Sequence, residues 1–126
     1  MFVRGIRGAI TVEENTSKDI LAGTKELLMR LIADNQLETE NIVSIIFSTT
    51  KDLNAVFPAK AARHLGLSQV PLLCCHEMEV PISLERCIRV LMHVNTTQLQ
   101  SDIEHIYLKG AAKLRPEYSV KGDDDI

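Results

Sequence analysis

Several residue types are scarce in this chain of 126 residues, and each scarcity excludes a class of function. There is no tryptophan, and the aromatic residues are two tyrosines and three phenylalanines, which argues against a platform that stacks nucleic-acid bases. The net charge is −3 without a strongly basic stretch, so nucleic acid is not expected as a partner. No apolar run approaches the roughly 18 residues of a membrane span, so we expect no membrane association.

The three cysteines are an odd number, and adjacent Cys74 and Cys75 are poorly suited to bridging each other. We therefore expect reduced thiols and a cytoplasmic location, and residues 1–8 are expected to begin a strand rather than a signal peptide. A phosphate loop, a Rossmann glycine pattern and a serine nucleophile elbow are all missing. Phosphoryl and hydride transfer therefore have no support.

The composition is that of one globular domain, with 45% hydrophobic and 25% charged residues. We expect this single domain to cover residues 1–116. Residues 117–126 are polar and include three consecutive aspartates, so we expect a flexible C-terminal tail.

Hydrophobic periodicity predicts a long helix over residues 17–34, with Thr16 as N-cap and Asp19 as its capping-box partner. A short helix is expected after Pro58, with Gly66 at its C-terminal end, and a helical turn at 110–114. The segment 42–48 is apolar on both parities, which is typical of a strand buried on both faces. The fold class is therefore α/β (α+β), with the long helix on one face of a mixed sheet of about five strands, expected at 2–12, 42–48, 70–75, 86–94 and 102–108.

A cluster of possible metal ligands lies between residues 74 and 87, but its spacing is unsuitable for zinc. It lacks both Cys-x2-Cys and a paired His-x3-His, so no metal is predicted. A nucleophilic cysteine beside a histidine base is also weakly supported, because Cys75 and His76 would point to opposite faces of a strand. The simpler explanation of the cysteines is that they are small buried apolar groups.

Arginines are the remaining candidates for chemistry. Arg7 and Arg89 lie within strands among small or apolar neighbours, while Arg63 and Arg115 lie on two further elements. Converging guanidinium groups suit a small dianion, and Glu77 would be the nearby acid. From these residues alone, an anion-binding pocket and a set of solvated arginines both remain open.

Several stretches in order resemble the monofunctional, trimeric chorismate mutases of the pseudo-α/β-barrel type. The resemblance runs in register to about residue 120. It is carried by MFVRGIRGAITV at 1–12, NAVFPAKAAR at 54–63, CCHEME at 74–79, CIRV at 87–90, HIYL at 105–108 and LRP at 114–116.

The resemblance implies a cofactor-free Claisen rearrangement of chorismate to prephenate, in a homotrimer with active sites between subunits. By position it implies that Arg7 holds a substrate carboxylate, Arg89 donates to the ether oxygen and Glu77 takes the ring hydroxyl. The other implied site residues are Cys74 near that hydroxyl, Tyr107 at the side-chain carboxylate, Phe57, Ala59, Lys60 and Arg63 from the neighbouring subunit, Leu114 in the pocket wall and Arg115 at the mouth.

Three features depart from a simple reading of that pattern, and one of them is the loop at residues 66–69, which is about one residue short. Leu73 stands where the family often has a small hydroxyl residue. Cys74 and Glu77 have opposite strand parity, so we expect a break at Cys75–His76 that lets both meet one ligand. The alternatives are a trimeric binding module that senses an aromatic-pathway dicarboxylate, and a trimeric enzyme of similar architecture that acts on small imino or enamine acids.

Overall fold

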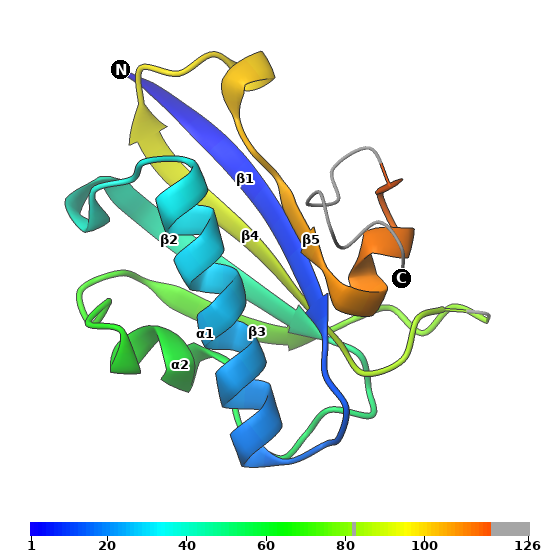
Figure 1. The fold of residues 1–126 in the computed structure, drawn as a ribbon. Coiled ribbons are helices and arrows are strands. Elements are labelled where there is room, and N and C mark those ends of the chain that lie inside the picture. The colour runs from blue at the N-terminus through cyan, green and yellow to red at the C-terminus, as the bar shows by residue number, and fades with distance from the viewer. Residues whose placement is uncertain (82, 117–126) are drawn as a thin grey trace.

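The computed structural model describes residues 1–81 and 83–116, which form a five-stranded mixed sheet with helices on one side (Figure 1). The strand order is β3-β2-β4-β1-β5. The elements are β1 (Phe2–Thr11), α1 (Ser17–Asp34), η1 (Thr39–Asn41), β2 (Ile42–Thr49), α2 (Ala59–His64), β3 (Leu72–His76), β4 (Cys87–Thr96), η2 (Gln100–Asp102), β5 (Ile106–Leu108) and η3 (Lys109–Lys113).

Helix α1 has the predicted limits, and its N-terminus has the predicted cap. The hydroxyl of Thr16 accepts from the Asp19 amide at 3.1 Å. The Asp19 carboxylate, however, accepts from the Glu14 amide at 3.2 Å rather than from Thr16. The Thr16 amide already donates to the Glu14 carbonyl, so the reciprocal half of a capping box is not needed.

One face of the sheet packs against α1 and α2 and contains the main hydrophobic core. Leu27, Leu28 and Leu31 of α1 are fully buried there, against strand residues such as Phe47 and Met92. The helix approaches β1 closely at Gly8, where a Cβ atom would lie 3.0 Å from the Leu27 side chain. The predicted long helix on one sheet face is confirmed.

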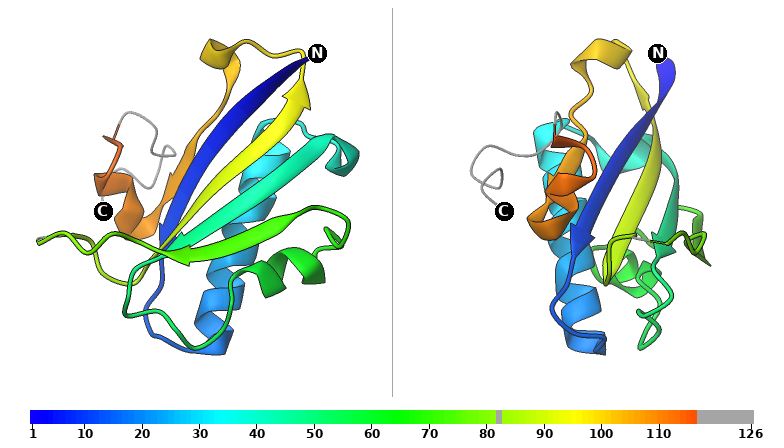
Figure 2. Two further views of the ribbon diagram at one scale, coloured as in Figure 1. Left: turned by 180° about the vertical axis from the view of Figure 1, so that it is seen from behind. Right: turned by 90° about the vertical axis from the view of Figure 1, so that its right-hand side faces the viewer.

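The opposite face, called here the open face, carries no helix across β2, β3 and β4 in the part of the chain that the structure describes (Figure 2, left). Near the end of β1, Leu84 and Leu114 partly cover it by packing on a small second cluster. That cluster consists of Ala9, Cys87, Tyr107 and Ala111.

The expectation that the second strand is buried on both faces is wrong for the isolated protomer. In β2, Ile45 and Phe47 are buried against the helices, while Ile46 and Ser48 on the open face are only partly buried. Among the described residues, no α-helix packs across Ile46, because α1 and α2 lie on the other side of the sheet.

The expected strand over 102–108 is much shorter in the structure. Only Ile106–Leu108 pair with β1, and Gln100–Asp102 form a 3₁₀ turn. The buried Asn35 side chain competes for the backbone before β5, because it both accepts from the Glu104 amide and donates to the Glu104 carbonyl. The short helix after Pro58 and the turn after β5 agree with prediction to within a residue or two.

The C-terminal tail expected at 117–126 lies outside the described residues. None of the helices within the described ranges is long and apolar enough to cross a membrane.

Candidate active site

The open face contains a cavity of about 330 Å³ that brings together six of the residues singled out from the sequence. Three are arginines and one is a glutamate, so the lining carries an excess of positive charge suited to an anion. The cavity is called here the sheet-face site. The six residues are Arg7, Glu77, Arg89, Tyr107, Leu114 and Arg115.

Strand register explains why residues far apart in sequence meet at this site. Ala9 of β1 lies opposite Arg89 of β4, and Arg89 lies opposite Ser48 of β2. Paired residues in neighbouring strands point to the same face. Ala9 also pairs with Tyr107 of β5, which brings the phenol to the open face beside the arginines.

Glu77 reaches the open face because the edge-strand pairing continues beyond the last residue of β3. The Glu77 amide donates to the Thr49 carbonyl at 2.7 Å. The carboxylate Oε1 accepts from the Ser48 hydroxyl at 2.6 Å and lies 3.3 Å from Nε of Arg89. The acid and the arginine are therefore in contact with each other.

The Arg89 guanidinium has hydrogen-bonding capacity that the described residues do not use. Its Nε atom is buried and has no acceptor with hydrogen-bond geometry among them, because the contact with Glu77 is poorly aligned. A buried donor of this kind is costly until a ligand oxygen accepts from it. Beneath Arg89, burial raises the pKa of the Cys87 thiol to about 11, so this cysteine stays neutral.

The backbone of Arg7 is held by the side chain of His105, next to Gly8, where the pairing of β1 with β5 begins. The Arg7 amide donates to Nδ1 of His105 at 3.0 Å. Burial lowers the pKa of His105, and the charges of Arg7 and Arg115 lower it further. The imidazole is therefore neutral near pH 7 and able to accept this hydrogen bond.

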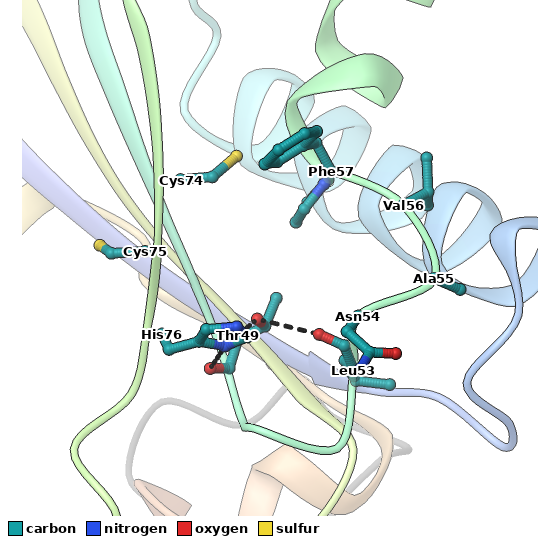
Figure 3. A pocket seen from close by; sticks show the side chains of 10 residues that line it. Thr49, Leu53, Asn54, Ala55, Val56, Phe57, Cys74, Cys75 and His76 are labelled. Atoms are coloured by element: carbon teal, nitrogen blue, oxygen red, sulfur yellow. Dashed lines mark hydrogen bonds between the residues drawn. The ribbon is translucent and has the colours of Figure 1, made fainter.

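A second cavity, of about 430 Å³, lies on the helix side of β3 and is called here the edge site (Figure 3). Cys74 and Cys75 both line this cavity, but only the Sγ atom of Cys74 points toward Phe57. Arg63 and Ala59 of α2 are close enough to Cys74 to act on its ionisation. Burial dominates and raises the pKa of the Cys74 thiol, which argues against a nucleophilic thiolate.

The predicted strand break at Cys75–His76 is wrong. Strand β3 pairs regularly with β2 from Leu72 to His76. Cys74 pairs with Phe47 on the helix face, while Glu77 has the parity of the open face. Cys74 and Glu77 of the chain therefore lie on opposite sides of the edge strand.

The predicted site residues thus fall into two groups on one chain. The sheet-face site holds the six named above, and the edge site has Phe57 and Cys74 in its lining. Ala59 is buried at the start of α2, while Lys60 and Arg63 are exposed on the same helix.

Sequence reasoning missed Ser48, whose hydroxyl contacts Glu77 directly. A signal was available, because Ser44, Ile46 and Ser48 alternate along one parity of an otherwise apolar strand. Two hydroxyls at this spacing indicate a face that is not fully apolar.

Comparisons with known proteins show which family the chain resembles. The family model described as chorismate mutase type I matches residues 3–118. The chain is 46% identical over 127 residues to chorismate mutase AroH of Bacillus subtilis, with all of both chains covered. It is 48% identical over 116 residues to chorismate mutase AroH of Thermus thermophilus, covering 91% of this chain and 95% of that protein.

The structural match is equally extensive. A chorismate mutase from Clostridium thermocellum superposes with a TM-score of 0.86 at 52% identity, covering 87% of this chain and 98% of that one. These matches confirm the resemblance inferred from the sequence motifs, and the chain belongs to the chorismate mutase type I family.

Proposed function

We propose that this protein is a chorismate mutase, an isomerase that rearranges chorismate to prephenate on the route to phenylalanine and tyrosine. The single observation that carries the proposal is the sheet-face site, where three arginines and one glutamate surround a cavity in a member of this family. Chorismate carries two carboxylates, and the arginine excess matches that charge.

The reaction breaks an ether C–O bond while a C–C bond forms, and it needs no nucleophile, general base or metal. Catalysis then depends on holding a chair-like conformer and on stabilising the charges that separate. We assign the ether oxygen to Arg89, whose buried Nε is available as a donor. Glu77 takes the ring hydroxyl and faces the positive charge that develops on the ring.

The two substrate carboxylates are assigned to the other cations and to the phenol. Arg7 binds one carboxylate, and its backbone is held in place by His105. Tyr107 binds the side-chain carboxylate from a largely buried position. Leu114 lines the pocket, and Arg115 covers its mouth.

We further propose a homotrimer in which the edge site of one chain completes the sheet-face site of its neighbour. The argument is the parity of β3, which separates Cys74 from Glu77 within a chain. The open face also presents apolar side chains to solvent, including Leu73 at 60% exposure and Val3 at 62%. Burial of such a face between copies is a common basis for symmetric oligomers.

In this arrangement Phe57, Ala59, Lys60, Arg63 and Cys74 reach the ligand from the neighbouring chain. Since burial keeps Cys74 a thiol, it would act there as a hydrogen-bonding group near the ring hydroxyl. We propose a cytoplasmic location on the basis of three free cysteines, which persist most readily in a reducing compartment.

The test is the loss of chorismate absorbance in the ultraviolet with purified protein, with prephenate identified as product. We expect turnover without added metal or cofactor, and the same rate in the presence of a chelator. Binding of chorismate without turnover would instead favour a sensor module.

A further inference from the structure

Ser48 lies beside the two opposite charges of the sheet-face site, Glu77 and Arg89. Its hydroxyl donates to Oε1 of Glu77 at 2.6 Å, and Nε of Arg89 is 3.3 Å from the same oxygen. Ser48 and Arg89 are direct partners in the β2–β4 ladder, so both side chains leave the sheet at the same level. One carboxylate oxygen therefore faces two competing donors.

The backbone of Glu77 is held next to β2 by the hydrogen bond from its amide to the Thr49 carbonyl. A carboxylate beside a guanidinium tends toward the bidentate pairing in which both oxygens accept parallel N–H donors. The observed contact with Arg89 is not of that kind, because it joins one oxygen to a poorly aligned Nε. The 2.6 Å hydrogen bond from the Ser48 hydroxyl holds Oε1, so it would oppose a rotation of the carboxylate toward Arg89.

We propose that Ser48 is a positioning residue, whose hydroxyl keeps Glu77 from closing onto Arg89 as a bidentate ion pair. A closed pair would occupy the guanidinium that must donate to the substrate. It would also move the carboxylate away from the ring hydroxyl. This inference rests on the function proposed above, since it concerns the availability of Arg89 and Glu77 to chorismate.

The test compares Ser48→Thr with Ser48→Val, two β-branched side chains of nearly equal volume that differ in the hydroxyl. We expect Ser48→Val to lower kcat/KM about tenfold, because a hydrogen bond to a charged group is lost. The larger share should fall on KM, since the closed pair forms in the free enzyme and the substrate must open it. Ser48→Thr should stay within about twofold of the parent, because it retains the donor. Equal rates for Thr and Val would overturn the proposal.

A second background shows whether Ser48 acts through Glu77. In Glu77→Gln the amide has no charge to attract Arg89, so the difference between Thr and Val at position 48 should disappear. If Val still lowers kcat/KM about tenfold relative to Thr in that background, Ser48 acts by another route and the proposal is wrong.

Ser44→Val is the matched control, because Ser44 lies on the same face of β2 and its hydroxyl contacts His93 rather than Glu77. We expect Ser44→Val to keep the parent rate. The thermal unfolding midpoint of each variant shows whether a lower rate comes from a destabilised fold or from a misplaced Glu77. If the valine prevents folding, Ser48→Ala replaces Ser48→Val.

A crystal structure of unliganded Ser48→Val or Ser48→Ala gives a readout that does not depend on turnover. Both carboxylate oxygens of Glu77 should lie against the Arg89 guanidinium in the variant. An unchanged Glu77 rotamer would overturn the inference even in an active enzyme. Absence of turnover in the parent protein would overturn the proposed function while leaving this structural test in place.

Discussion

Mixing two inactive variants should restore activity if the active site is shared between chains. Arg89→Ala removes the donor of the sheet-face site, and Arg63→Ala removes the cation beside Cys74 at the edge site. Each variant alone should lose about a hundredfold or more in kcat, by analogy with the loss of one preorganised donor to a developing oxyanion. In a mixed trimer, some sites take Arg89 from the Arg63→Ala chain and Arg63 from the Arg89→Ala chain. Such a site contains neither mutation.

The size of the recovery follows from the arrangement of the two half-sites. In a ring with head-to-tail contacts, each site takes its sheet face from one chain and its edge from the next. After random reassembly at equal concentrations, about half of the chains supply an intact sheet face and about half an intact edge, so about one quarter of the sites are fully intact. The mixture should therefore recover about a quarter of the parent activity per site.

The assay is chorismate consumption after joint denaturation and refolding, or after co-expression with two affinity tags. The matched control mixes Arg89→Ala with Glu77→Gln, which damage the same half-site and should give no recovery. Activity no higher than the sum of the separate variants in the first mixture would refute the shared site.

The remaining predictions concern catalysis and stability. Arg89→Lys keeps the charge but loses the planar fork, so kcat should fall about a hundredfold or more in steady-state assays, and a near-normal rate would remove Arg89 from its role. Gly8→Ala should destabilise the fold by about 1–3 kcal/mol in urea titrations, because the new Cβ would lie 3.0 Å from Leu27 and 3.1 Å from the Ile106 carbonyl; unchanged stability would mean that α1 can shift freely. The lowered pKa of His105 means that the unfolded chain binds the proton more readily, so its contribution to stability is present above about pH 6.5 and is lost as pH falls through the folded-state pKa. His105→Asn, which offers an amide oxygen near the position of Nδ1, should weaken that pH dependence in denaturation curves compared from pH 7 to pH 5, and identical curves for parent and variant would contradict the assignment.

The parts of the fold that depend on residues close together in the sequence were predictable. The apolar spacing and the Thr16 cap define α1 because both act within a few residues along the chain. The end of β5 was not predictable in the same way. The Asn35 side chain hydrogen-bonds to the backbone amide and carbonyl of Glu104, which is 69 positions away. A local sequence pattern cannot indicate that these backbone groups bind a distant side chain instead of a strand.

The sequence indicated which residues line the sheet-face site, but it did not indicate how they are arranged in space. The motifs identified Arg7, Glu77 and Arg89, but their convergence depends on the β1–β4 and β2–β4 registers, which the sequence pattern does not specify. Ser48 lies within a run that reads as buried strand, so its contact with Glu77 became visible only once β2 was placed between β3 and β4.

The strand break predicted at Cys75–His76 is wrong because the backbone pairing of β3 with β2 outweighs any need for Cys74 and Glu77 to face one ligand. Strand parity placed Cys74 and Glu77 on opposite faces, and the expectation of a single shared ligand required a break between them. The continuous pairing with β2 keeps five backbone positions in register, and the Glu77 amide extends it to Thr49. A bulge would forfeit part of that pairing on an edge strand that has only one neighbour.

Keeping the ladder intact has a consequence for the enzyme as a whole. Because β3 is regular, Cys74 and Glu77 lie on opposite sides of it. In the proposed homotrimer, the second set of groups therefore arrives from another copy. That copy can approach along the open face, where Leu73 is exposed and Glu77 and Arg89 already lie. The regular edge strand therefore supports the proposed division of the site between chains, and in the proposed homotrimer assembly is a condition for catalysis.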